Sequence, residues 1–334
     1  MGLTPLTMKE KIAVLLGGQS SEREISIKSG TAVYEALLSL GLDVICIDVS
    51  GDPTGQIRQA KAGVVFIALH GRFGEDGTIQ AVLEKEKMPY TGSGPKASRL
   101  CMDKLASRRI FENAGLPVPE YIAIKKRNRA RFLALCCKHR KTIPKIGVCP
   151  PFSLPVVVKP NREGSSIGMS IVGDTKDLAK AINEAFSYDD NILVEKFIDG
   201  EDITVGILDD KPLPVVHIKP KYGVYDYTAK YTDGMSEYVV PAELEGRIIK
   251  EAQDLGLKAH NLLGCRCFSR VDMRLGKDKK IRVLEVNSIP GLTANSLLPK
   301  AAKAAGIDFA HMCLKMVKNG ARKATPDTTD GNNL

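Results

Sequence analysis

LEVNSIPGLTANSLLP, residues 284–299, joins the end of a predicted strand to a Pro-Gly turn and the start of a helix. Within the strand, Glu285 and Asn287 lie two residues apart, a spacing that places both side chains on one face. A carboxylate and an amide oxygen are hard ligands of the kind that Mg²⁺ takes when it also holds phosphates. The stretch therefore predicts a metal and phosphate site at the end of this strand.

A second predicted strand, SRVDMRL at residues 269–275, adds to the same site. Arg270 and Asp272 share one face of it by the same two-residue spacing. For Glu285 or Asp272 alone, a polar residue at the end of a buried strand is the simpler interpretation. The two strands together, followed by the SIPGLT turn, favour a site equipped for phosphoryl transfer.

The composition describes a soluble globular protein. The chain has 334 residues, 43% of them hydrophobic and 26% charged, which favours two or three domains. The first apolar run, IAVLL, is too short for a transmembrane span or a signal peptide, so we expect a cytoplasmic protein. The eight cysteines include no CxxC pair and no second Cys/His pair that would complete a zinc site, so reduced thiols are expected.

The net charge of +9 comes from one segment. Nine lysines and arginines lie between residues 125 and 145 with no acidic residue among them, and they account for the whole excess. A solvated surface insertion is the favoured interpretation. Contact with RNA or a membrane is the alternative.

The N-terminal part predicts a parallel α/β layer. KIAVLLGGQSSEREIS begins with a strand and a Gly-Gly turn, followed by a helix with Ser20 and Ser21 as expected caps. Two further strands, DVICIDV and GVVFIALHG, alternate with helical stretches at about 32–40 and 79–86, and another helix is predicted at 98–105. Functional groups gather past the carboxyl ends of such strands, where Glu22 and His70 fall.

SLPVVVKPNREGSSIGMSIV, residues 153–172, predicts a hairpin lid over a nucleotide. Its first strand carries Lys159, and a Gly-containing loop at 162–168 precedes the returning strand. Amides in such a loop can cradle phosphates while the lysine supplies a point charge. The loop lacks the Walker A spacing, and an ordinary hairpin with a polar turn is the alternative.

Two later segments complete the pattern. In NILVEKFIDGEDITVGIL, the connector at 195–198 offers backbone and acidic groups to an adenine. The aromatic and polar segment YGVYDYTAKY, residues 222–231, suits a mobile loop. Helices are expected at 176–186, 242–263, 296–305 and 309–318.

Eight motifs in this order resemble those of D-alanine–D-alanine ligases of the ATP-grasp type, from about residue 11 to about residue 317. They are KIAVLLGGQSSEREIS, FIALHGRFGEDG, PYTGSG with MDKL, VVVKPNREGSSIGMS, LVEKF, YDYTAKY, SRVDM and LEVNSIPGLTANSLLP. The resemblance implies an α/β (α+β) protein with a three-domain ATP-grasp fold and an N-terminal Rossmann-like parallel sheet. The implied domains are 1–103, 104–196 with the lid loop, and 197–320 with the metal and D-alanine sites, before a disordered tail at 321–334.

The resemblance also implies the reaction. ATP would phosphorylate the carboxylate of one D-alanine, and the amine of a second would attack the acyl phosphate, giving D-alanyl-D-alanine for peptidoglycan precursors, ADP and phosphate. ATP as substrate and two Mg²⁺ ions are implied, with Mn²⁺ as a substitute. A homodimer is expected, with D-alanine and ATP as small-molecule partners and with no nucleic acid or membrane.

Roles for individual residues follow from the resemblance alone. The implied catalytic residues are Glu22, Ser165, Tyr231, Arg270 and Gly291, and the implied D-alanine-binding residues are His70, Lys230, Ser296 and Leu297. The implied ATP-binding residues are Lys104, Lys159, Ser166, Glu195, Lys196, Phe197, Ile198 and Asp202, and the implied metal ligands are Asp272, Glu285 and Asn287.

Some positions depart from the family pattern, and two other functions stay open. Asp202 stands where relatives carry Glu, and Phe197 and Val224 differ near the adenine site, which bears on nucleotide affinity. Tyr231 favours a dipeptide over a D-alanyl-D-lactate product. A ligase with another acceptor, such as D-serine, is one alternative. The other is a regulatory nucleotide-binding module that holds RNA or a membrane through its basic segment.

Overall fold

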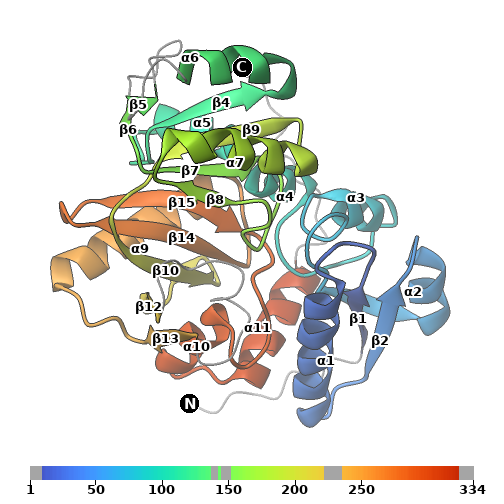
Figure 1. Cartoon of the computed structure of the whole chain (residues 1–334). Coiled ribbons are helices and arrows are strands. Elements are labelled where there is room, and N and C mark those ends of the chain that lie inside the picture. The colour runs from blue at the N-terminus through green and yellow to red at the C-terminus, as the bar shows by residue number, and fades with distance from the viewer. Residues whose placement is uncertain (1–9, 137–141, 144–151, 222–234, 323–334) are drawn as a thin grey trace.

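The computed structural model describes residues 10–136, 142–143, 152–221 and 235–322. The predictions for Val224, Lys230 and Tyr231, and for the loop at 222–231, lie outside the described residues. The described chain forms three lobes, each built on one larger sheet (Figure 1).

The N-terminal lobe contains the predicted parallel sheet. Its strands are β1 (Lys11–Gly17), β2 (Val44–Val49) and β3 (Ala62–Ile67), in the order β2-β1-β3, and all its pairs are parallel. The lobe also contains the helices α1 (Arg23–Ser39), α2 (Thr54–Ala60) and α3 (Thr78–Lys85). Alternate residues of β1 belong to two different hydrophobic cores, which explains why this strand is apolar without interruption.

Two local predictions in this lobe are wrong. Helix α1 begins at Arg23, and its N-cap position is taken by Glu22 and not by Ser20 or Ser21. The Ser20 hydroxyl donates a hydrogen bond to the backbone oxygen of His70 and accepts one from the backbone nitrogen of Glu22. The single helix predicted at 98–105 is two helices, α4 (Pro95–Met102) and α5 (Lys104–Asn113). Asp103 separates them with an extended backbone, and its side chain caps α5.

The central lobe holds the predicted hairpin. Its sheet has the order β4-β9-β7-β8, formed by β4 (Tyr121–Lys125), β9 (Asn191–Lys196), β7 (Val156–Pro160) and β8 (Ser170–Val172), all antiparallel. Helix α7 (Thr175–Tyr188) packs on it, and β5 (Thr142–Ile143) pairs with β6 (Phe152–Ser153). The described lysines and arginines of the basic segment lie at the end of β4, in the 3-10 helix η1 (Lys126–Asn128) and in helix α6 (Arg129–Cys136), and they are exposed.

The C-terminal lobe holds the two strands with which the sequence argument began. Its sheet has the order β13-β12-β10-β14-β15, and β11 (Lys211–Pro212) pairs with β10 at one side. The bounds of the other strands are β13 (Ser236–Val239), β12 (Val216–Pro220), β10 (Gly200–Leu208), β14 (Phe268–Gly276) and β15 (Ile281–Asn287). Helix α9 (Gly246–Leu262) packs on β10, β14 and β15.

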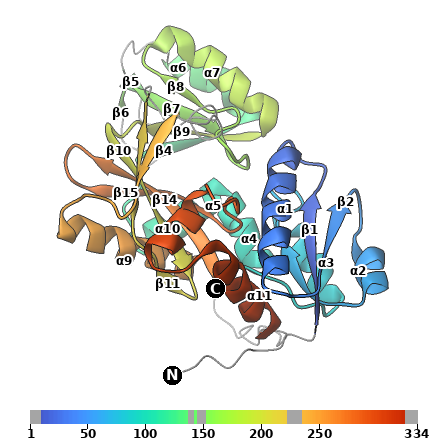
Figure 2. The same ribbon diagram turned by 90° about the horizontal axis from the view of Figure 1, so that it is seen from below.

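The last helices connect the C-terminal and N-terminal lobes. Helix α10 (Leu297–Ala304) packs on β10, whereas α11 (Phe309–Arg322) packs on α1 and β3, as Figure 2 shows. One hydrophobic core therefore contains Val14 of β1, Leu298 of α10 and Met316 of α11. The predicted domain boundaries stay a prediction. The predicted tail starts inside α11, and its residues beyond 322 lie outside the described chain.

Candidate active site

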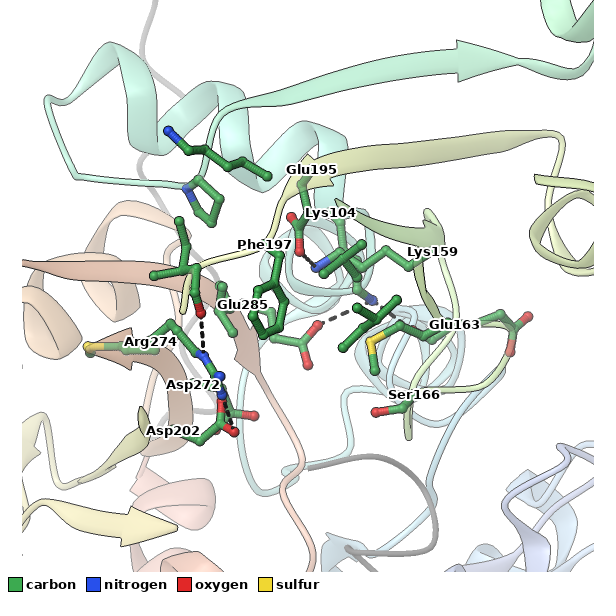
Figure 3. Close-up of a pocket in the computed structure, with 18 of the residues that line it drawn as sticks. Lys104, Lys159, Glu163, Ser166, Glu195, Phe197, Asp202, Asp272, Arg274 and Glu285 are labelled. Atoms are coloured by element: carbon green, nitrogen blue, oxygen red, sulfur yellow. Dashed lines mark hydrogen bonds and ion pairs between the residues drawn. The ribbon is translucent and has the colours of Figure 1, made fainter. Parts of the chain in front are cut away.

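A pocket of about 990 Å³, including its open mouth, lies between the central and C-terminal sheets (Figure 3). Strands β7 and β9 supply one wall, β10, β14 and β15 supply the other, and the start of α5 also contributes. All eight residues implied in ATP binding line it, together with two of the three implied metal ligands: Lys104, Lys159, Ser166, Glu195, Lys196, Phe197, Ile198, Asp202, Asp272 and Glu285.

A buried ion pair joins the two strands of the central wall. Lys159 on β7 and Glu195 on β9 lie on neighbouring strands, and the Lys159 Nζ is 2.7 Å from the Glu195 Oε1. Burial lowers the pKa of Lys159, and the charge of Glu195 opposes that shift. Burial would raise the pKa of Glu195, but the positive charges of Lys159 and Arg108 outweigh it and hold this pKa below its usual value.

Lys104 connects the lid to the opposite wall. It is the first residue of α5, and its buried Nζ donates a hydrogen bond of 2.7 Å to the backbone oxygen of Glu163 in the lid loop. The same Nζ lies 3.3 Å from the Glu285 Oε2. Two lysines from different elements therefore bring positive charge into one pocket.

The implied metal ligands lie together on β14 and β15, and two of them line this pocket. Asp272 on β14 is paired in register with Glu285 on β15, and Asn287 donates a hydrogen bond of 2.9 Å to the Asp272 Oδ2. Arg270 forms two hydrogen bonds with the same carboxylate, at 2.8 and 2.7 Å. The described residues contain no cluster of three or more His, Cys, Asp or Glu side chains that could hold a metal alone.

This set of oxygens still fits Mg²⁺. The ion is commonly held by one or two carboxylates while substrate phosphates and waters complete its coordination. Asp272 and Glu285 face each other across two paired strands and both line the pocket. In the structure Arg270 forms an ion pair with Asp272, and Lys104 forms one with Glu285. Both carboxylates therefore already have a positively charged group beside them.

Two residues further along β14 from Asp272, the pocket has a polar group that the sequence argument missed (Figure 3). Arg274 lies 2.5 Å from the Asp202 Oδ2, donates a hydrogen bond of 2.9 Å to the backbone oxygen of Ile198, and stacks over the Phe197 ring at 5.4 Å. The signal was present, because Arg274 continues the two-residue alternation of Arg270 and Asp272. Asp202, which is one methylene shorter than the Glu of relatives, therefore has Arg274 as a fixed partner beside the connector at 195–198.

A second group of implied residues lies outside this pocket, around Glu22. The hydroxyl of Ser165 in the lid loop donates a hydrogen bond to the buried Glu22 carboxylate. Burial raises the pKa of Glu22, and the nearby Glu75 adds to that shift. His70 is also buried, with its Nε2 at 3.0 Å from the Ser29 hydroxyl and its Nδ1 at 3.7 Å from Glu75.

The loop after β15 connects to this second group. The backbone nitrogen of Leu292 donates a hydrogen bond of 3.4 Å to the Ser29 hydroxyl, which is the partner of His70. A side chain at Gly291 would approach the Ser296 hydroxyl to 2.9 Å. Ser296 and the buried Leu297 open α10. Gly291 and Ser296 thus lie beside each other, on a loop joined to the Glu22 group.

The remaining walls of the pocket are mostly apolar side chains to which the sequence argument gave no role. They come from β7, the lid, its returning strand and the C-terminal sheet, and apolar side chains of this kind suit a flat apolar base. These residues are Val157, Ile167, Met169, Ile171, Ile203, Ile218, Met273 and Leu284.

A hairpin lid and two antiparallel sheets around a pocket with buried lysines and facing carboxylates define an enzyme of the ATP-grasp class. Comparison with known proteins is more specific. Residues 51–93 match the family described as D-ala D-ala ligase N-terminus, and residues 110–318 match D-ala D-ala ligase C-terminus. The chain belongs to the D-alanine–D-alanine ligase family.

Individual relatives agree over nearly the whole chain. The D-alanine–D-alanine ligase of Pelobacter propionicus is 46% identical over 92% of this chain and 94% of its own length. The D-alanine–D-alanine ligase of Trichlorobacter lovleyi is 44% identical over 94% of this chain and 96% of its own length.

Solved structures show the same likeness. The Bacillus anthracis D-alanine–D-alanine ligase complexed with ATP has a TM-score of 0.77 and 31% identity, covering 94% of this chain and 98% of its own. The VanG D-Ala:D-Ser ligase of Enterococcus faecalis has a TM-score of 0.78 and 29% identity, covering 93% and 99%. No helix in the described ranges is both long and apolar enough to cross a membrane.

Proposed function

We propose that this chain joins two D-alanines into D-alanyl-D-alanine with ATP, in the cytoplasm, for peptidoglycan precursor synthesis. The observation that carries the proposal is the pairing of Asp272 with Glu285 in a pocket that also holds Lys104 and Lys159. Both substrates of the first step are anions, so a site for their reaction needs concentrated positive charge.

The roles within the nucleotide site follow from position. Lys104 and Lys159 neutralise the phosphates, and the lid loop with Ser166 closes over them. The connector of Glu195, Lys196, Phe197 and Ile198 holds the adenine, and Asp202 lies beside it in the pocket. The apolar side chains of the walls exclude water from the base.

Asp272, Glu285 and Asn287 would hold two Mg²⁺ ions, with Mn²⁺ as a substitute. The metal supplies charge neutralisation between the ATP phosphates and the attacking carboxylate. The protein's own groups align the substrates. Arg270 is fixed by two hydrogen bonds to Asp272, which keeps its guanidinium beside the phosphate end of the pocket.

In the first step, a carboxylate oxygen of one D-alanine attacks the γ-phosphorus and ADP leaves, which gives a D-alanyl phosphate. Glu22 binds the ammonium group of this D-alanine, with Ser165, His70 and Tyr231 around it. In the second step, the amine of the other D-alanine attacks the acyl carbon and loses a proton, and phosphate leaves.

The second step also needs groups that hold the other D-alanine and the developing oxyanion. Arg270 and the backbone amide of Gly291 stabilise the tetrahedral oxyanion. Lys230, Ser296 and the amide of Leu297 hold the carboxylate of the second D-alanine.

The test measures ADP release with ATP and Mg²⁺, and compares D-alanine with L-alanine and with D-serine. We expect turnover with D-alanine and not with L-alanine. Glu285→Gln, which keeps the side-chain shape, should lower kcat by roughly 100-fold or more. Glu243→Gln on the exposed surface is the matched control. An inactive wild-type protein that still binds ATP would refute the proposal.

D-serine at the second site is the competing substrate, favoured by the likeness to the Enterococcus faecalis D-Ala:D-Ser ligase. Product analysis with equal D-alanine and D-serine separates the two functions. We expect mostly D-alanyl-D-alanine, and a majority of D-alanyl-D-serine would move the chain to the second function. D-lactate in the same assay tests the role assigned to Tyr231.

The chain is also proposed to form a homodimer. Light scattering of the purified protein should give about twice the chain mass of 36.2 kDa. A mass equal to one chain at working concentrations would contradict this.

A further inference from the structure

Arg108 is the largest fully buried side chain in the described residues, and no step above uses it. It lies on α5 one helical turn after Lys104, so both side chains leave the same face of the helix. Lys104 lines the nucleotide pocket, whereas Arg108 does not. A guanidinium with 0% exposure is costly to bury unless it is paired, so its partner indicates its role.

The partner of Arg108 is Glu195. The Arg108 Nη2 donates a hydrogen bond of 2.7 Å to the Glu195 Oε2, while the Lys159 Nζ lies 2.7 Å from the other oxygen, Oε1. Arg108 also donates a hydrogen bond of 3.3 Å to the backbone oxygen of Pro119, and its guanidinium lies 5.7 Å from the Tyr121 ring centre. Helix α5 is thereby fixed to β9 from behind the pocket wall.

The three side chains carry two positive charges and one negative charge. Without Arg108, Glu195 and Lys159 would form a neutral pair. The Glu195 carboxylate would then neutralise the positive charge of Lys159 before a phosphate bound. With Arg108 behind the carboxylate, the group keeps a net charge of +1. Of the two cations, only Lys159 lines the pocket.

We propose that Arg108 is a positioning residue for ATP: it holds Glu195 from behind and leaves the charge of Lys159 available to the nucleotide phosphates. This role rests on the proposed ATP site and adds a residue that never touches the ligand. Arg108 acts on ATP through Glu195 and Lys159, and not on D-alanine, because its contacts within the described part of the chain are with Glu195, Pro119 and Tyr121 and not with the Glu22 group.

The experiment measures ATP binding directly by calorimetry, and the KM values for ATP and D-alanine separately. Arg108→Met replaces the guanidinium with a shorter, apolar side chain and so removes the charge. We expect the dissociation constant and KM of ATP to rise about 10-fold or more, because a unit charge acts over several ångströms of partly buried protein. The KM of D-alanine should stay within about 2-fold.

Arg108→Lys is the rescue variant, because it keeps the positive charge next to Glu195. We expect its ATP affinity to lie within about 3-fold of the wild-type value. A purely structural role would lower the thermal midpoint and the active fraction of both variants, and would leave the ATP constants of the folded fraction unchanged. Unchanged ATP constants in folded Arg108→Met, or an equal loss in Arg108→Lys, would overturn the proposal.

If Arg108→Met does not fold, Arg108→Gln replaces it, since the amide can still donate to Glu195 without a charge. The same 10-fold loss of ATP affinity is then expected. Binding and turnover also separate the two proposals. Loss of ATP affinity in a protein that does not ligate D-alanine would support the role of Arg108 and refute the proposed reaction.

Discussion

Glu22 shows how a functional group can oppose stability at the scale of one residue. It is buried, its pKa is raised first by burial and then by Glu75, and Ser165 donates the hydrogen bond described above. A raised pKa means that the folded protein holds this proton more tightly than the unfolded chain does. Ionised Glu22 therefore costs stability at neutral pH.

Glu22→Gln should raise the free energy of unfolding at pH 7.5 by about 1 kcal/mol while ligation is lost. The gain should shrink as the pH falls toward the ordinary glutamate value of 4.5, where the unfolded chain also binds the proton. Urea unfolding at several pH values measures it, with exposed Glu243→Gln as the control. A less stable Glu22→Gln protein at pH 7.5 would contradict the argument.

Which site residues could be predicted depended on whether their neighbours were near in sequence. Asp272 and Glu285 followed from strand alternation, and so in principle did Arg274. Arg108 could not be found this way, because it lies outside the quoted motifs and its partner Glu195 is 87 positions away. Only the folded chain brings that pair together.

At the scale of elements, the break between α4 and α5 positions Lys104. The Asp103 carboxylate accepts hydrogen bonds of 3.0 Å from the Ala106 nitrogen and from Asn161, and Arg162 pairs with its other oxygen. Burial would raise the pKa of Asp103, but these hydrogen bonds outweigh it and lower the pKa. The cap therefore stabilises the fold while it is ionised.

Asp103→Asn should lower the free energy of unfolding by about 1–2 kcal/mol at pH 7. A lowered pKa means that the contribution is complete above the ordinary value of 3.8 and is lost as the pH falls through the folded value, so the two proteins should converge in acid. Asp177→Asn on the exposed side of α7 serves as the control. A difference that does not depend on pH would rule out the carboxylate as the cause.

The same break explains why one helix was expected at 98–105. No proline or glycine interrupts that segment, so the local pattern continues across Asp103. The interruption comes from the lid base, where Asn161 accepts hydrogen bonds from the backbone of Lys104 and Leu105. A contact between residues more than fifty positions apart overrides the local preference.

At the scale of the whole molecule, Arg72 joins the N-terminal lobe to the lid. Its guanidinium donates hydrogen bonds of 2.7 Å to Glu163 and 3.3 Å to the backbone oxygen of Tyr188. The Arg72 side chain is 65% exposed, so this pair adds little to static stability. We expect the Arg72 contact to act instead on how the lid is aligned with the N-terminal lobe.

Arg72→Ala should change the free energy of unfolding by less than about 1 kcal/mol and lower kcat/KM for D-alanine several-fold, because lid closure completes the site. Steady-state kinetics and thermal unfolding measure both effects. Arg58→Ala, which breaks an ion pair with Glu86 within the N-terminal lobe, is the matched control. Equal kinetics for the two variants would refute the role of the Arg72 contact.

The sequence pattern predicted many of the strands and helices of each lobe, but it did not predict the surface on which α11 packs. Its buried side chains include Met312 and Met316, whose spacing indicates a helix with one apolar face. Spacing does not say which surface that face meets. The structure places it on α1 and β3, which lie near the start of the chain, so the last described helix helps to build the N-terminal core.

The lid loop carries two adjacent residues, Ser165 and Ser166, with left-handed backbones at φ 50° and 60°. For residues with a Cβ this conformation costs roughly 1 kcal/mol or more each. The contacts of the loop therefore have to offset this conformational cost in the conformation that the structure shows. When the products leave, this backbone strain favours opening of the loop, so the strain would set part of the turnover rate. Glycine at both positions would remove the strain and lengthen the lifetime of the closed loop.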